Sequence, residues 1–283
     1  MLLAPRYDGP TVLSIDGDPS DQLAPICRQH RRMQATLAEL SADQWATHSR
    51  CEGWSVRDVA SHLIDVNSFW RASVLAGLAG NPTRFLASFD PAATPPLLVE
   101  RMSSLTTDDV LDQFVTTSEA FLAVLEGLTE REWSTLAESP AGHVPVRLVT
   151  EHALWDSWIH ERDIIIPLDI DPVVEDDEVR SCLRYAAAVS PVLGFGVGRS
   201  VAGTFAVHAT NPEMRFMLDI GDSVSVREAT VEGAPCLEGD AVSLIESLSL
   251  RAPLPASAPR VWMQAIGGLQ TVFDASERSN LRN

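Results

Sequence analysis

The stretch WDSWIHERD, residues 155–163, places a carboxylate and an imidazole four residues apart. On an α-helix, this spacing turns Asp156 and His160 the same way, with about 5–6 Å between their Cβ atoms. His152, one turn earlier, lies near the same stripe. Inward-facing charge needs a partner, so the pattern indicates either a divalent metal site or an ordinary hydrogen-bonded Asp–His pair. An adjoining apolar stripe predicts that this face is buried, and it comprises Leu148, Trp155 and Ile159.

Composition excludes several classes of function. The chain of 283 residues has a net charge of −18, which argues against nucleic acids and anionic membrane surfaces as partners. All 21 basic residues are arginine, so a mechanism that requires a lysine is excluded. No run reaches the ~18 to 20 apolar residues of a membrane helix, and the first residues lack the layout of a secretion signal. We therefore expect a cytoplasmic protein.

The cysteines are widely separated and form no C-x-x-C pair. This spacing argues against a disulfide framework and against a cysteine-rich zinc site, as is typical of a protein from a reducing compartment. Each cysteine is interpreted as a small buried hydrophobe rather than a nucleophile. The residues concerned are Cys27, Cys51, Cys182 and Cys236.

Helical periodicity dominates the first 165 residues. His30 and His62 fall on or beside apolar helix faces, where a structural histidine is the ordinary interpretation, unless the Asp156–His160 pair faces His62 across a bundle. The proline-rich residues 80–107 predict a long connection with one short helical turn. Apolar residues at three- and four-residue spacing predict helices over 21–40, from the capping residue Ser55 onward, over 107–128 and over 144–165.

These helices, joined with one long connection, predict an all-α four-helix bundle over residues 1–168. A small α+β domain is expected over residues 169–283, because the pattern beyond Gly194 shifts towards a period of two. Its predicted elements are helices near 176–192, 240–250 and 259–273, and strands over 204–210, 215–220 and 223–228.

Three motifs together resemble the mycothiol-dependent maleylpyruvate isomerase family, part of the DinB-like superfamily of metal-binding four-helix bundles. They are CEGWSVRD at 51–58, His62 within ASHL, and D-x3-H-x2-D at 156–163. The resemblance covers about residues 20–166. Residues 239–251 resemble, more weakly, the small sterol-carrier-like α+β domain of that family.

The resemblance implies a divalent metal, usually zinc, held by His62, Asp156 and His160. Asp156 stands where the family has glutamate. Aspartate is an acceptable zinc ligand at ~2 Å, but it is one methylene shorter, so the helix must approach more closely or a water must intervene. His152 would then act as a further ligand or orient one of the three. Three protein ligands leave an open position, which is the pattern of a catalytic zinc site.

The family further implies that mycothiol, the co-substrate, is held as a metal-bound thiolate that attacks a small electrophilic substrate. The chain would then be an isomerase or an S-transferase, with Arg251 either binding a substrate carboxylate or exposed to solvent. Two alternatives stay open: a metal-binding protein without catalysis, and a carrier of a small apolar ligand. The sequence assigns no catalytic residue and does not identify the substrate or the oligomeric state.

Overall fold

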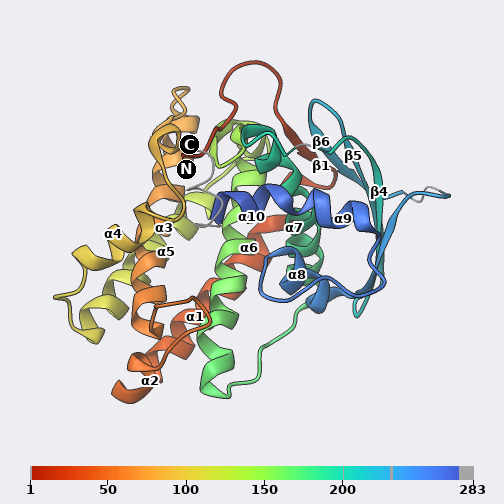
Figure 1. Cartoon of the computed structure of the whole chain (residues 1–283). Coiled ribbons are helices and arrows are strands. Elements are labelled where there is room, and N and C mark those ends of the chain that lie inside the picture. The colour runs from red at the N-terminus through yellow and green to blue at the C-terminus, as the bar shows by residue number, and fades with distance from the viewer. Residues whose placement is uncertain (1, 200, 230–231, 274–283) are drawn as a thin grey trace, which may run out of the picture.

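The computed structural model describes residues 2–199, 201–229 and 232–273. Its N-terminal part is helical, as the periodicity predicts, and long helices run side by side on the left of Figure 1. Residues 80–107 hold more helix than the predicted single turn. The elements of this part are α1 (Leu23–Ala38), α2 (Ala42–Ala46), α3 (Val56–Leu78), α4 (Thr94–Arg101), α5 (Thr107–Glu126) and α6 (Val146–Ile165).

Local sequence signals explain where α3 and α5 begin. The Ser55 side chain accepts a hydrogen bond from the backbone of Asp58, and the Asp58 carboxylate accepts one from Ser55 in return. Thr106 and Asp109 form the same reciprocal cap at the start of α5. Such capping boxes satisfy backbone donors that the first helical turn leaves unpaired. The predicted start of α3 after Ser55 is therefore confirmed.

Within the described residues, one mixed five-stranded sheet has the order β1-β6-β5-β4-β7. The three strands predicted from alternating residues form its centre as β4, β5 and β6, paired antiparallel. The flanking strands β1 and β7 pair in parallel with β6 and β4, and the sequence did not indicate them. The bounds are β1 (Leu13–Ile15), β4 (Gly203–Thr210), β5 (Met214–Ile220), β6 (Val224–Arg227) and β7 (Cys236–Asp240).

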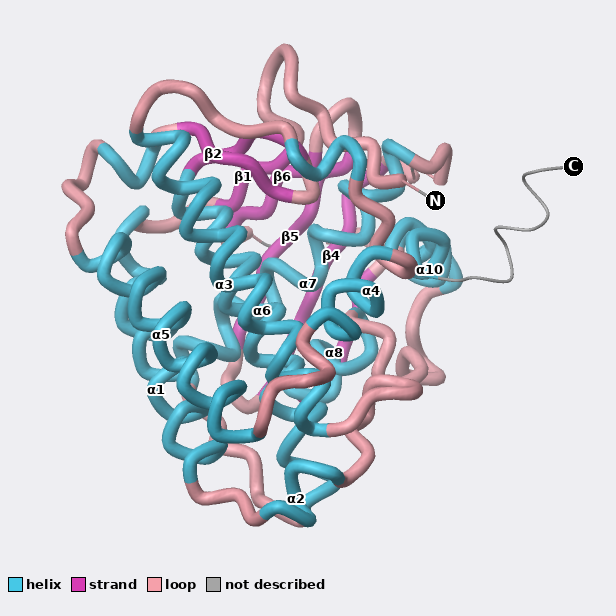
Figure 2. The backbone as a smooth tube through the Cα atoms, turned by 90° about the vertical axis from the view of Figure 1, so that its left-hand side faces the viewer, coloured by secondary structure: helices cyan, strands magenta, loops and turns pink. Residues whose placement is uncertain are grey.

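Helix α7 (Asp176–Gly196) joins the helical part to the sheet. It contacts α6 as well as β1, β5 and β6, and Figures 1 and 2 show it between the long helices and the strands. The helices α8 (Ala241–Leu248), α9 (Arg260–Ala265) and α10 (Gly267–Phe273) also contact α7. The remaining elements are a hairpin, β2 (Leu136–Ser139) and β3 (Gly142–Pro145), and the 3-10 turns η1 (Pro19–Gln22), η2 (Phe85–Ser88), η3 (Glu132–Ser134) and η4 (Ile166–Leu168).

A buried ion-pair network fixes α1, α6 and α7 relative to one another. The Arg32 guanidinium of α1 donates to both oxygens of Glu161 on α6, at 2.8 Å each. It also donates to both oxygens of Glu178 on α7, at 3.1 and 2.8 Å. Glu178 is fully buried and Glu161 is 4% exposed. Arg32 is the ion-pair partner of Glu161, whereas Glu178 also pairs with Arg28 at 2.9 Å. No helix of the described residues is long and apolar enough to cross a membrane.

Replacing Arg32 by methionine is expected to lower the free energy of unfolding by about 3 kcal/mol, because it leaves the buried Glu161 carboxylate without its ion-pair partner. Chemical denaturation at neutral pH measures the change. Arg31→Met is the matched control, because the neighbouring Arg31–Glu126 pair is about half exposed on both sides and should contribute no more than ~1 kcal/mol. Equal losses in the two variants would contradict the role given to Arg32.

Candidate metal site

The structure brings His62, Asp156 and His160 together where α3 faces α6. Their potential ligand atoms all lie within 4.8 Å of one another. Nε2 of His160 is 3.7 Å from Oδ1 of Asp156, and the imidazole rings of His62 and His160 are centred 5.2 Å apart. The Asp156–His160 pair therefore does face His62 across the helices, which was the condition for a role of His62 beyond that of a structural histidine.

This donor set fits a divalent metal ion. Two ligands of one tetrahedral zinc ion, each ~2.1 Å from the metal, are ~3.4 Å apart, close to the 3.7 Å between His160 and Asp156. Imidazole nitrogen and carboxylate oxygen are both zinc ligands. The three residues are partly or largely buried, with Asp156 20% and His160 12% exposed in their side chains, so solvent keeps limited access.

The electrostatics of the three residues are strongly coupled. Burial lowers the pKa of His62 to about 3, and a positive charge on His160 acts in the same direction. Burial also favours the neutral form of His160, but the negative charge of Asp156 and the hydrogen bond with Asp163 outweigh it and raise the pKa of His160 well above its ordinary value. Burial raises the pKa of Asp156, against the opposing charge of His160. The positive charge of His160 and the negative charge of Asp156 thus stabilise each other against the effect of burial.

Asp163 holds the other side of the His160 ring. Its fully buried carboxylate lies 3.1 Å from Nδ1 of His160. A carboxylate can only accept this hydrogen bond, so Nδ1 of His160 carries a hydrogen and Nε2 is the nitrogen that faces Asp156 and His62. A histidine that ligates a metal typically donates its second ring N–H to a carboxylate in this way. Asp163 belongs to the motif at 156–163, but no role was predicted for it. Its position three residues after His160 indicates that the two side chains can meet on one helix face.

Arg251 is a counter-charge of Asp163, together with His160 and with Arg50, whose Nε lies 3.5 Å from Oδ1. Its guanidinium donates through Nε to Oδ1 at 2.9 Å and through Nη2 to Oδ2 at 2.7 Å. Burial alone would raise the pKa of Asp163, but the hydrogen bonds from His160 and Arg251 hold it well below its ordinary value. Arg251, 26% exposed in its side chain, is therefore neither a free surface arginine nor an unengaged group for a substrate. It ties the segment after α8 to the end of α6.

Cys51 belongs to this cluster and is a partly buried, hydrogen-bonded side chain, whereas a small buried hydrophobe was expected. Its Sγ lies 3.2 Å from Oδ2 of Asp163 and 3.6 Å from Nδ1 of His160. Cys51, His160 and Asp163 form a second group with metal-ligand geometry. Because both oxygens of Asp163 already accept hydrogen bonds from Arg251, the group of His62, Asp156 and His160 suits a metal better.

His152 lies outside both groups with metal-ligand geometry that the described residues form. Its Nδ1 is 2.6 Å from the hydroxyl of Tyr185 on α7, and its ring packs against Trp70, with centroids 4.8 Å apart. The ring is 8% exposed. His152 is thus not one of the grouped metal ligands. It hydrogen-bonds instead to Tyr185 on the neighbouring helix α7.

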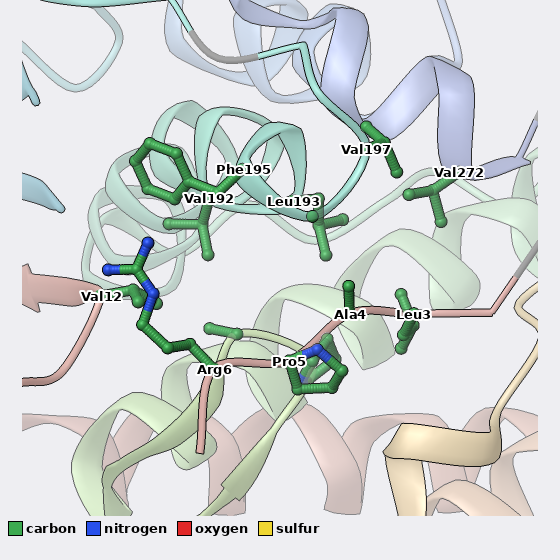
Figure 3. A pocket seen from close by; sticks show the side chains of 13 residues that line it. Leu3, Ala4, Pro5, Arg6, Val12, Val192, Leu193, Phe195, Val197 and Val272 are labelled. Carbon is green, nitrogen blue, oxygen red and sulfur yellow. The ribbon is translucent and has the colours of Figure 1, made fainter. Parts of the chain in front are cut away.

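A separate pocket of about 360 Å³ lies between the N-terminal segment, α7 and α10. Figure 3 shows mainly apolar side chains around it, with Arg6 at one side. The Arg6 guanidinium is itself engaged, because it donates to the backbone oxygen of Asp222 at 2.7 Å and lies over the Phe195 ring. None of the candidate metal ligands lines this pocket.

The fold places the chain in a known structural class. It resembles the crystal structure of the mycothiol-dependent maleylpyruvate isomerase with a TM-score of 0.60 and 12% sequence identity, over 83% of this chain and 90% of that chain. A histidine-to-alanine mutant of that isomerase gives the same values. At this identity, the likeness concerns the fold.

A family model matches the sequence of the helical part of the chain. Residues 27–165 match the model of the mycothiol maleylpyruvate isomerase N-terminal domain, from α1 to the end of α6. This match confirms the resemblance to that family indicated by the motifs. No curated protein sequence matches the chain significantly.

The contact between Asp163 and Arg251 is expected to be strongly coupled in a double-mutant cycle. Asp163→Asn and Arg251→Met should each destabilise the protein by about 3 kcal/mol, because each removes one partner of a buried, hydrogen-bonded ion pair. The double variant should be less destabilised than the sum by at least ~1 kcal/mol. Denaturant unfolding of the four proteins measures this coupling.

The exposed pair of Asp8 and Arg84 provides the control cycle, since both side chains are more than half exposed. Its coupling, from Asp8→Asn and Arg84→Met, should stay below ~1 kcal/mol. If the Asp163–Arg251 cycle were additive, Arg251 would not be a charge that stabilises Asp163.

Proposed function

We propose that this chain is a metal- and mycothiol-dependent enzyme, either an isomerase or an S-transferase, that acts on a small electrophilic substrate. The observation that carries the proposal is the convergence of His62, Asp156 and His160, with ligand atoms within 4.8 Å of one another, in the part of the chain that matches the isomerase family model. The name of the structural relative, a mycothiol-dependent maleylpyruvate isomerase, supports the same class of reaction.

The protein's own residues would do three things. His62, Asp156 and His160 would hold the ion through two imidazoles and one carboxylate, which leaves a position for a thiol. Asp163 would keep His160 in the tautomer that presents Nε2. A bound divalent metal such as zinc would keep a coordinated thiol deprotonated at neutral pH. The shorter Asp156 side chain would be accommodated by the close approach of α6 and α3.

The architecture proposed for this function is a DinB-like four-helix bundle of α1, α3, α5 and α6 that carries the metal. We assign it to residues 1–168, and the α+β unit to residues 169–283. The ion pair between Asp163 and Arg251 would connect the units beside the metal. The strand β1 crosses between them, because it lies in the first range and pairs with β6 in the second.

A carrier of small apolar ligands is the weaker candidate. It would require a closed apolar cavity under the strands and no convergence of polar groups at His62 and His160. These two rings are instead 5.2 Å apart. A metal-binding protein without catalysis would share the same site, and a thiol-transfer assay on the metal-loaded protein separates it from an enzyme.

Elemental analysis of the purified protein tests the site. We expect about one zinc or another divalent ion per chain in the wild type, and its loss in both His160→Ala and Asp156→Ala, since each removes one of three ligands. His208→Ala is the matched control, because this histidine lies on β4 and pairs with Glu213. A wild type that holds no metal after addition of zinc and dialysis would refute the proposal.

A further inference from the structure

His152 and Trp70 form a second polar pair along the contact between α3 and α6, which also carries the candidate metal site. At the metal site, His62 of α3 faces His160 of α6, with rings centred 5.2 Å apart. Eight residues later on α3 and eight earlier on α6, Trp70 faces His152 with centroids 4.8 Å apart. The two helices therefore run antiparallel, and Asp156 lies one turn from each histidine of α6. Both pairs face the same line of contact.

Tyr185 determines which nitrogen of His152 carries the proton. Its hydroxyl lies 2.6 Å from Nδ1 of His152, and Tyr185 is 1% exposed. Among the described residues, this hydroxyl has no second hydrogen-bond partner. Since a buried hydroxyl needs an acceptor for its hydrogen, the phenol donates and Nδ1 accepts.

Both groups are neutral in this arrangement. Burial raises the pKa of the Tyr185 hydroxyl well above its ordinary value, and burial lowers the pKa of His152 to about 3. A neutral imidazole carries one hydrogen, so the ring of His152 presents an N–H at Nε2. Within the described part of the chain, this nitrogen has no hydrogen-bond partner.

Trp70 supplies a second N–H that the described residues leave unpaired. Its indole Nε1 is buried and without a partner, and the whole residue is 4% exposed. Buried donors are nearly always satisfied in native proteins, and an exception calls for a water or a ligand. Two donors without a partner in the described ranges thus lie on adjacent rings, and His152 is one turn of α6 from Asp156.

We propose that Nε2–H of His152 and Nε1–H of Trp70 together bind a carbonyl or carboxylate oxygen of the electrophilic substrate. The inference rests on the proposed function and adds the group that recognises the substrate. Tyr185 acts as a positioning residue, because it fixes the tautomer of His152 without reaching the substrate.

The chemistry of thiol addition explains why two neutral donors are useful there. The thiolate sulfur forms a bond to the β-carbon, and the electron pair of the C=C bond moves to the carbonyl oxygen. The former double bond is then single and can rotate. Return of the electron pair re-forms the double bond and expels the thiolate, so no oxidant or reductant is needed. Donors aimed at the oxygen stabilise the charge that develops during this step.

The first test reads the tautomer directly. Protein labelled with 15N-histidine is examined by NMR, and the His152 signals are identified by their absence in His152→Gln. We expect a protonated Nε2 and an unprotonated Nδ1 in the wild type, and a loss of this preference in Tyr185→Phe. A hydrogen on Nδ1 of His152 in the wild type would overturn the proposal.

The second test measures binding of maleate, an unsaturated dicarboxylate, to zinc-loaded and zinc-free protein by calorimetry. His152→Gln and Trp70→Phe should each weaken maleate binding about five- to tenfold, the effect of one hydrogen bond, while zinc content stays at the wild-type level. Trp133→Phe, a change at another buried tryptophan, should leave binding unchanged. Unchanged maleate affinity in both His152→Gln and Trp70→Phe would overturn the proposal.

The two tests separate this inference from the proposed function. A wild type that fails to hold zinc would refute the proposed function alone. Maleate binding to the zinc-free protein that still depends on His152 and Trp70 would then support the donor pair. Conversely, full zinc content with maleate binding that ignores both residues would refute the donor pair and leave the metal site standing.

Discussion

The buried carboxylate of Asp163 is the constraint on which the site depends. A carboxylate with no exposed surface must have its charge compensated within the protein. It draws its partners from three separate segments: His160 on the same helix, Cys51 in the loop before α3, and Arg251 after α8. Satisfying one charge therefore fixes the His160 ring and holds the C-terminal part of the chain beside it. The orientation of the candidate metal ligand and the packing of the two parts have the same cause.

Helix α6 carries polar groups on several faces because it is surrounded by other elements. One face turns Asp156 and His160 to α3, another gives Glu161 to the Arg32 network, and His152 reaches Tyr185 on α7. Such a helix lacks the single apolar stripe of a surface helix. Each polar side chain has a specific partner on a different neighbour, so the helix cannot rotate or shift without losing several of them. That fixed position is what a metal or substrate site requires.

Much of the helical part could be predicted because its signals are local. Apolar periodicity located the long helices, a cap located the start of α3, and the spacing of Asp156 and His160 predicted a shared face. The contacts that escaped prediction are distant in sequence. Cys51 and Arg251 are 112 and 88 residues from Asp163. The sequence next to each of them does not indicate that Asp163 is its partner. The strand β1 has only three residues, too few for an alternating pattern, and its pairing depends on the sheet already being present.

The parallel pairing of β1 with β6 has a consequence for how the protein is made. Leu13 lies opposite Val224 in this ladder, so β1 must wait for a partner that is synthesised more than 200 residues later. Residues 13–15 therefore leave the ribosome before their partner strand exists. This edge of the sheet can close only after residues 224–226 have been made.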